Sequence, residues 1–182
     1  MTHKEIVSLI EGAVLREDDG AGIAWADLGS GEGAFTLGLR ELLGPRAWIF
    51  SVDKNKRRLA VQKEAFDANF PGSPTEFIHA DLAGDKWREG LPDLDGILMA
   101  NTLHFFGNQE EFLATLRTLL KPHGRLVIVE YDTDRKSLFV PHPLTFETWQ
   151  TLAERSGFGA AKLIARAKSK YWGSMYGALA LR

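Results

Sequence analysis

The chain has 182 residues, of which 45% are hydrophobic and 25% are charged, and its formal net charge is −2. This profile indicates one globular domain that buries a core, and it shows no basic excess that would make nucleic acid an expected partner. The absence of cysteine excludes disulfides, thiolate metal sites and cysteine nucleophiles. We predict no metal site. The lack of cysteine suits a reducing compartment, so we expect a cytoplasmic protein. No apolar run approaches the roughly 18 residues that cross a bilayer, so we expect no membrane partner.

The chain begins with a predicted amphipathic helix over residues 3–17, inside an N-terminal helical segment that we place at 1–20. Its apolar residues recur at helical spacing. They are Ile6, Leu9, Ile10, Ala13 and Val14.

A strand over residues 23–28 then leads into a loop with glycines at 29, 31 and 33, and a helix over 34–43 follows. A glycine turn between a strand and a helix places a small ligand against the helix N-terminus, where free backbone N–H groups can meet it. Glycine lets the backbone come close to that ligand. The loop therefore predicts a ligand site.

Strands and helices alternate over the middle of the chain. The predicted strands are 47–52, 75–80, 95–100 and 125–130, and the predicted helices are 55–69 and 109–120. Residues 82–93 are predicted to form a loop with a helical turn, and residues 121–124 a turn. The inner residues expected for the helix over 55–69 are Leu59, Val61, Ala65 and Phe66.

The end of the chain breaks this alternation. An irregular stretch over 132–143 precedes a predicted helix over 144–156, and two predicted strands, 160–167 and 174–181, follow without room for a helix between them. The last two strands must therefore be antiparallel. The sequence predicts an α/β fold with a doubly wound, Rossmann-like, mostly parallel sheet that an antiparallel strand closes.

Polar residues follow each predicted parallel strand, and in open α/β sheets ligands bind at that edge. Asp53 ends the second strand, where a carboxylate can accept hydrogen bonds from two ribose hydroxyls. Asp81 ends the third strand and can accept from an adenine amino group, with Leu82 against the ring. The alternatives are a turn-forming Asp53 and a helix-capping Asp81.

Asp27 lies two positions before Gly29, at the expected mouth of the site. A carboxylate there suits a ligand with an ammonium group better than it suits a pyrophosphate. The alternative is a carboxylate that accepts hydrogen bonds from nearby loop N–H groups.

The segment Asp27–Gly33 (DLGSGEG) resembles the first motif of class I S-adenosylmethionine-dependent methyltransferases. Asp53, Asp81, the segment Leu120–Glu130 and the terminal strand pair resemble later landmarks of this family, so the resemblance runs from about residue 20 to 182. It implies a seven-stranded sheet whose last strand lies antiparallel between the fifth and the sixth.

The resemblance also implies S-adenosylmethionine as the cofactor. It places the glycine loop at the methionine part, Asp53 at the ribose hydroxyls, Asp81 and Leu82 at the adenine, and Asn101 near the sulfonium and the substrate. The predicted cofactor-binding residues are therefore Asp27, Gly29, Ser30, Gly31, Gly33, Asp53, Lys54, Asp81, Leu82 and Asn101.

Methyl transfer from a sulfonium is an in-line displacement, so the protein mainly supplies positioning. A general base is needed only if the acceptor must lose a proton. His104, which follows the fourth strand, is the first candidate because imidazole titrates near neutral pH. Tyr131 and Asp132 are alternatives, and a packed, non-catalytic histidine remains open.

We expect a small molecule as the methyl acceptor. The alternatives are methyl transfer to RNA or protein, which a positive patch beside the pocket would favour, and a non-catalytic cofactor-binding subunit. An NAD-dependent oxidoreductase is disfavoured by Asp27 and by the terminal strand pair. The stretch 132–143 is a candidate lid on the substrate side, apolar residues within 138–149 are candidate pocket walls, and a homodimer could complete the pocket.

Overall fold

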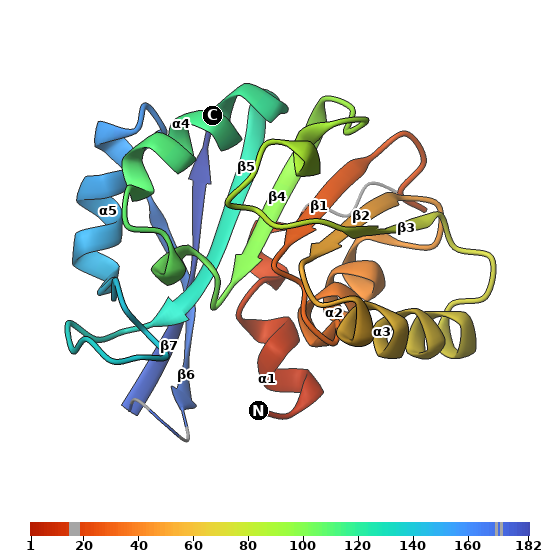
Figure 1. Ribbon diagram of the computed structural model, residues 1–182, viewed down its shortest axis with the longest axis horizontal. Helices are drawn as coiled ribbons and strands as arrows, with labels where there is room; N and C mark the ends of the chain where they lie inside the picture. Colours follow the sequence, from red (N-terminus) through yellow and green to blue (C-terminus); the bar gives the residue numbers. More distant parts are fainter. Residues whose placement is uncertain (15–18, 170, 172) are drawn as a thin grey trace.

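The fold is built on one sheet with the strand order β3-β2-β1-β4-β5-β7-β6 (Figure 1). The computed structural model describes residues 1–14, 19–169, 171 and 173–182. The strands are β1 Ala24–Leu28, β2 Trp48–Asp53, β3 Thr75–His79, β4 Leu94–Ala100, β5 Leu120–Tyr131, β6 Lys162–Ser169 and β7 Gly173–Leu181.

The sheet is parallel from β3 to β5, and β7 runs antiparallel to both of its neighbours, β5 and β6. In Figure 1 the arrowheads of β4 and β5 point to the lower edge of the view, and that of β7 points upward. This arrangement confirms the predicted seven-stranded sheet with its last strand inserted antiparallel. The C-terminal ends of the parallel strands therefore share one edge.

The described part of the chain has five α-helices and three short 3-10 helices, of which α1 and η1 precede the first strand. The helix α3 shows the local cause of a boundary, because the side chain of its N-cap Asn55 accepts hydrogen bonds from the backbone N–H groups of Arg57 and Arg58. The helices are α1 His3–Ser8, η1 Glu11–Ala13, α2 Ala34–Leu43, α3 Lys56–Asn69, η2 Lys86–Arg88, η3 Leu103–Phe105, α4 Gln109–Leu119 and α5 Phe146–Arg155.

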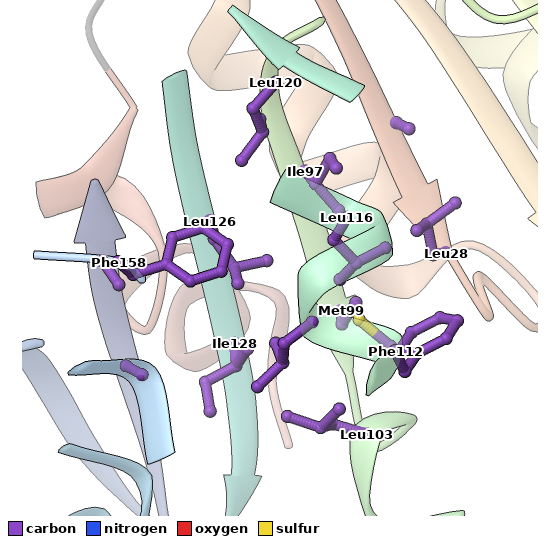
Figure 2. Packing of buried hydrophobic residues seen from close by; sticks show 14 of the residues in the cluster. Leu28, Ile97, Met99, Leu103, Phe112, Leu116, Leu120, Leu126, Ile128 and Phe158 are labelled. Atoms are coloured by element: carbon purple, nitrogen blue, oxygen red, sulfur yellow. The ribbon is translucent and has the colours of Figure 1, made fainter. Parts of the chain in front are cut away.

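Two apolar cores lie on the two faces of the sheet. On one face, α4 and α5 cover β4, β5 and β7, and Figure 2 shows Leu116 and Phe112 of α4 over Ile97 and Met99 of β4. On the other face, α1 and α2 pack through Ile6, Leu39 and their neighbours. Because both faces are covered, the parallel strands read as continuous apolar runs.

The predicted N-terminal helix over 3–17 is wrong in extent, because α1 ends at Ser8 and η1 follows. Gly12 lies in η1, where an added Cβ would stand 3.1 Å from Ile164 Cγ2 of β6, and glycine is a poor α-helix former. Residues 15–18 lie outside the described residues. The apolar residues expected for this helix are nevertheless buried: Ile6, Leu9, Ile10, Ala13 and Val14.

Two further differences concern α3 and β5. Val61 was predicted to face the core but is 49% exposed, and Gln62 is buried in its place. The predicted turn over 121–124 is part of β5, which already pairs at Leu120 and then shifts register. His123 has a φ of 63° within that irregular stretch. No helix in the described ranges is long and apolar enough to cross a membrane.

Candidate functional site

The candidate site is a cavity of about 500 Å³ at the C-terminal ends of β1, β2, β3 and β4. Thr102 and Phe105, which follow β4, form its other wall. Six of the residues predicted to bind the cofactor line this cavity: Gly29, Asp53, Lys54, Asp81, Leu82 and Asn101. The structure thus brings residues from four separate loops to one place, as the shared strand edge requires.

The glycine loop is held tightly against its neighbours. The N–H groups of Gly29 and Ser30 both donate to the carbonyl of Val52, at 2.8 and 3.1 Å. Gly29 has a φ of 80°, and a Cβ added there would lie 2.3 Å from Thr102 Oγ1. Only glycine satisfies both conditions, so the backbone of this loop can form one wall of the cavity.

Asp53 joins the loop to β2 and remains at the cavity wall. Its Oδ2 accepts from the N–H of Gly31 at 2.9 Å, and its Oδ1 accepts from the N–H of Asn55 at 2.7 Å. Each carboxylate oxygen has a second lone pair, so Asp53 can still accept hydrogen bonds from a ligand.

Asp27 lies beneath the glycine loop rather than at its mouth, which corrects the expected position. Its side chain is 1% exposed, and its Oδ2 accepts from Thr36 Oγ1 at 2.5 Å. Burial raises the pKa of the Asp27 carboxyl to about 7, the hydrogen bond from Thr36 opposes this rise, and the charge of Asp53 adds to it. Asp27 Oδ1 is buried without a hydrogen-bond partner, so it is an acceptor available to a donor from the loop side.

A buried amide supports the loop from below. Gln62 of α3 accepts hydrogen bonds through Oε1 from Ser51 Oγ at 2.9 Å and from Ser30 Oγ at 3.2 Å. A Cβ added at Gly33 would lie 2.3 Å from Gln62 Cγ. Ser30 and Gly33 thus rest on this network, and neither lines the cavity.

Asn101 occupies a strained position at the end of β4. Its φ is 51°, a left-handed conformation that a non-glycine residue adopts at a cost, and its N–H donates to the carbonyl of Val129 at 2.8 Å. Its side-chain Oδ1 is buried and has no hydrogen-bond partner. The backbone therefore fixes an unsatisfied acceptor at the cavity wall.

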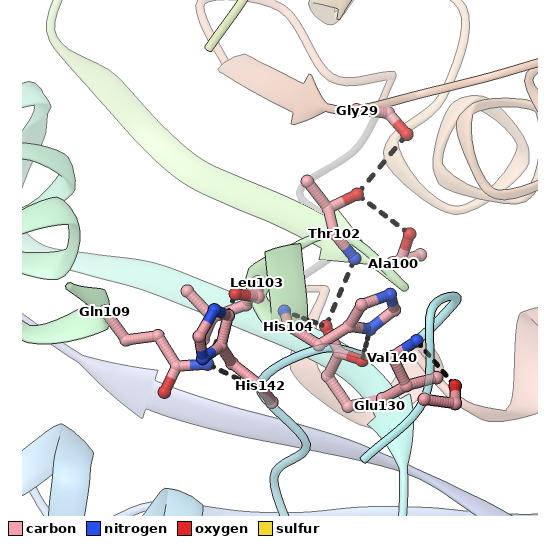
Figure 3. A network of polar contacts seen from close by, with 10 residues as sticks. Gly29, Ala100, Thr102, Leu103, His104, Gln109, Glu130, Val140 and His142 are labelled. Carbon is pink, nitrogen blue, oxygen red and sulfur yellow. Dashed lines mark hydrogen bonds and ion pairs between the residues drawn. The ribbon is translucent and has the colours of Figure 1, made fainter. Parts of the chain in front are cut away.

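His104 and Glu130 form a buried pair next to this wall, drawn in Figure 3. They are 2% and 1% exposed, and the ring N–H at Nδ1 donates to Glu130 Oε2 at 2.6 Å. Glu130 Oε1 accepts from the backbone N–H groups of Thr102 at 3.1 Å and His104 at 3.3 Å. The carboxylate thus fixes the imidazole tautomer, and Figure 3 shows Nε2 pointing away from Glu130.

The other two candidate bases are placed less favourably. The ring of Tyr131 lies 6.3 Å from that of His104, and burial together with the charge of Glu130 raises the pKa of its hydroxyl. Asp132 forms an ion pair with Arg166 and accepts from the N–H of Phe146 at 3.0 Å. The raised pKa makes the Tyr131 hydroxyl a poor proton acceptor, and the Asp132 carboxylate is engaged by Arg166 and by the backbone of Phe146.

The sequence reasoning missed the role of two supporting residues. Gln62 gave no signal, because nothing marks one glutamine among the polar residues of a charged helix. Glu130 was expected at the shared edge, as the polar end of the fifth strand, but its pairing with His104 was not predicted. Of the apolar residues expected as pocket walls, Val140 and Trp149 are buried, whereas Leu138 and Phe139 are 94% and 77% exposed.

Comparison with known proteins agrees with this geometry. The sheet with its inserted antiparallel strand, the glycine loop after β1 and the acidic end of β2 define the class of S-adenosylmethionine-dependent methyltransferases. Within this class, the chain belongs to the family described as Methyltransferase domain, whose family model matches residues 19–175.

The chain is similar to parts of larger proteins. The ubiquinone/menaquinone biosynthesis C-methyltransferase UbiE of Pseudomonas fluorescens is 28% identical over 121 residues, which cover 65% of this chain and 45% of that protein. The lovastatin diketide synthase mokB of Monascus pilosus is 26% identical over 162 residues, which cover 77% of this chain and 6% of the synthase. The chain therefore spans less than half the length of these two relatives.

A solved structure gives a closer view of the fold. The CurJ carbon methyltransferase superposes with a TM-score of 0.77 at 21% identity, and the alignment covers 98% of this chain and 54% of that one.

The residues of the cavity and its surroundings fit S-adenosylmethionine. Asp27 Oδ1 and Asn101 Oδ1 are buried acceptors without donors, and Asp53 keeps free lone pairs. A cofactor with an ammonium group and two ribose hydroxyls supplies donors to such acceptors, whereas a pyrophosphate supplies none. At Gly31 an added Cβ would meet no heavy atom within 4 Å, so the outer side of the loop is open.

Proposed function

We propose that this chain transfers a methyl group from S-adenosylmethionine to a carbon atom of a small molecule, and that His104 removes the proton of the acceptor. The buried His104–Glu130 pair beside the cofactor cavity carries this proposal. A methyl acceptor needs a base of this kind only when it must lose a weakly acidic proton, as a C–H next to a carbonyl does.

The pair is suited to that step. Because Glu130 holds the proton on Nδ1, the lone pair of Nε2 faces away from the carboxylate. In the proposed step Nε2 takes the proton of the acceptor carbon, and the carbanion forms the new bond to the methyl carbon while the carbon–sulfur bond breaks. The carboxylate stabilises the imidazolium that results. When bound, the sulfonium supplies an already activated methyl group.

The cofactor is proposed to lie along the cavity wall. Asp53 accepts from the ribose hydroxyls with Lys54 beside it, and Asp81 and Leu82 bind the adenine. The loop of Gly29, Ser30, Gly31 and Gly33 surrounds the methionine part, Asp27 Oδ1 accepts from its ammonium group, and Asn101 lies near the sulfonium. The support for this placement is the shared cavity and the two unpaired acceptors.

The names of similar proteins support carbon as the acceptor atom. UbiE is described as a C-methyltransferase and CurJ as a carbon methyltransferase. A solved neighbour from Burkholderia thailandensis is described as 1,6-didemethyltoxoflavin-N1-methyltransferase with bound 1,6-didemethyltoxoflavin, and this description supports a small molecule as the acceptor.

RNA is a second candidate acceptor, which one observation favours. Lys54, Lys56, Arg57 and Arg58 are exposed, and Lys54 and Arg58 line the cavity. This is a positive patch beside the pocket. Methyl transfer to RNA would fall steeply as salt rises, because phosphate contacts release counterions, whereas transfer to an uncharged small molecule would not.

The first experiment measures cofactor binding by calorimetry with S-adenosylhomocysteine. Asp53→Asn should weaken binding about 10- to 100-fold, since it replaces a charged acceptor of hydrogen bonds. Asp67→Asn, an exposed aspartate of α3 paired with Lys63, is the matched control and should bind as wild type does. Binding of NAD in place of S-adenosylhomocysteine would overturn the cofactor assignment.

The second experiment measures transfer of a labelled methyl group to a 1,3-dicarbonyl thioester, a hydroquinone and an unstructured RNA. His104→Gln should lower kcat for methyl transfer to carbon by about 10²- to 10⁴-fold and leave the binding of S-adenosylhomocysteine unchanged. An equal rate in His104→Gln would refute the role of the base. Tight cofactor binding without transfer to any acceptor would favour a non-catalytic subunit.

A further inference from the structure

Gln109 joins the short helix that carries the proposed base to a second segment of the chain. It is the first residue of α4, and its side-chain Nε2 donates to the carbonyl of His142 at 3.0 Å and to that of Leu103 at 3.3 Å (Figure 3). A side-chain amide has two N–H hydrogens, so these two bonds use both of them. Leu103 belongs to η3 and His142 to the stretch 132–143.

A backbone bond completes this connection. The N–H of His142 donates to the carbonyl of His104 at 3.0 Å. The backbone of His142 is therefore hydrogen-bonded to η3 through its N–H and to Gln109 through its carbonyl. The 3-10 helix η3 has three residues and few internal hydrogen bonds, those from Phe105 to Thr102 and from Phe106 to Leu103. Its position, and with it that of His104, therefore depends on contacts from outside the helix.

The segment on the other side of this connection is itself ordered by hydrogen bonds. Ser137 Oγ accepts from the N–H groups of Phe139 at 3.2 Å and Val140 at 3.0 Å, and the N–H of Ser137 donates to the carbonyl of Val140. Val140 is 1% exposed, whereas Leu138 and Phe139 point into solvent. A fixed turn with a buried anchor thus leads directly to His142.

We propose that Gln109 is a positioning residue for His104. By holding His142 against η3, Gln109 makes the placement of the imidazole depend on the segment 137–142. The segment then fixes the base from the substrate side, while Glu130 fixes it from the sheet. This inference rests on the proposed function, because the placement of His104 matters to catalysis only if His104 is the base.

Gln109→Glu is the variant that tests this role. Glutamate has nearly the same size and shape but cannot donate to the two carbonyls, and an acidic residue at the start of a helix is favourable. If Gln109 acts only as the first residue of α4, Gln109→Glu should be as stable as the wild type or more stable, and the position of the His104 ring should not change. Gln150→Glu is the matched control, because Gln150 of α5 donates through Nε2 to the carbonyl of Ala161 at 3.3 Å, away from η3.

The decisive readout is the nuclear magnetic resonance signals of the ring nitrogens of His104, assigned by their loss in His104→Gln. Gln109→Glu should move these signals and lower kcat about 10- to 100-fold, with binding of S-adenosylhomocysteine unchanged, since misplacing a catalytic group by about 1 Å has an effect of that size. Gln150→Glu should leave signals and kcat as in wild type. Unchanged His104 signals in a folded Gln109→Glu protein would overturn the proposal.

The two proposals can fail separately. If His104→Gln keeps the wild-type rate, the base assignment is wrong, whereas the ring signals still report whether Gln109 positions His104. If Gln109→Glu does not fold, Gln109→Leu serves as the second variant, and the same ring signals decide the outcome. If the His104 signals shift from their wild-type positions in Gln109→Leu but not in Gln150→Leu, the positioning role is supported. If the signals of both variants stay at their wild-type positions, the role is refuted.

Discussion

Replacing Asp27 with asparagine should remove a large part of the pH dependence of folding stability. The carboxyl is buried, and its pKa rises from an ordinary value of 3.8 to about 7 in the folded protein. The folded state therefore binds a proton that the unfolded state has lost between these two values. Its contribution to stability is fully present below about pH 4 and is lost as the pH rises through about 7.

The size of this effect follows from the two pKa values. A rise of about three units corresponds to about 4 kcal/mol at 1.36 kcal/mol per unit, of which about 2–3 kcal/mol is lost between pH 5 and pH 8. Urea unfolding of wild type and Asp27→Asn at those two pH values measures it. Asparagine does not titrate, so its stability should fall less over the same range. An equal change in both proteins would refute the assignment of a raised pKa to Asp27.

Three further predictions follow from the same site. As the pH rises toward 7, the affinity of the wild type for S-adenosylhomocysteine should increase by about tenfold per pH unit, because more Asp27 is ionised and attracts the ammonium group. Calorimetry of Asp27→Asn should show no such increase. Gly29→Ala should destabilise the fold by about 2–4 kcal/mol and abolish cofactor binding, since alanine there combines a positive φ with a clash against Thr102. Gly31→Ala places its Cβ in open space and should lower the free energy of unfolding by only about 1 kcal/mol. Thermal unfolding of the two variants checks this difference. Thr102→Val should weaken cofactor binding by about tenfold and Thr102→Ser should restore it, because the hydroxyl contacts the carbonyls of Ala100 and Gly29; equal binding by all three proteins would contradict this role.

The sequence was informative where the backbone alone decides the structure. The glycine loop, the acidic end of β2 at Asp53 and the polar end of β4 at Asn101 come from neighbouring parallel strands, so their shared edge follows from topology. The terminal strand pair was predicted because the connection between its strands is too short for a crossover helix. These features depend on chain order and spacing, which a sequence contains.

The sequence was less informative where side chains from distant segments meet. Gln62 lies one position after Val61, and only the packing of α3 beneath Gly33 decides which of the two is buried. Asp27 was placed at the mouth of the site because its strand ends there, but its bond to Thr36 holds the carboxylate beneath the loop. The partner of His104 also depends on the rotamers of two buried side chains, which no local pattern encodes.

The structure of this chain with S-adenosylhomocysteine tests the central claim most directly, because it shows where the cofactor lies relative to Asp53 and His104. The account predicts that the ribose hydroxyls lie within hydrogen-bond distance of the Asp53 carboxylate and that the adenine packs against Leu82. It predicts that the sulfur lies between Asn101 and His104. A nucleoside bound elsewhere, or a sulfur far from the His104–Glu130 pair, would contradict it.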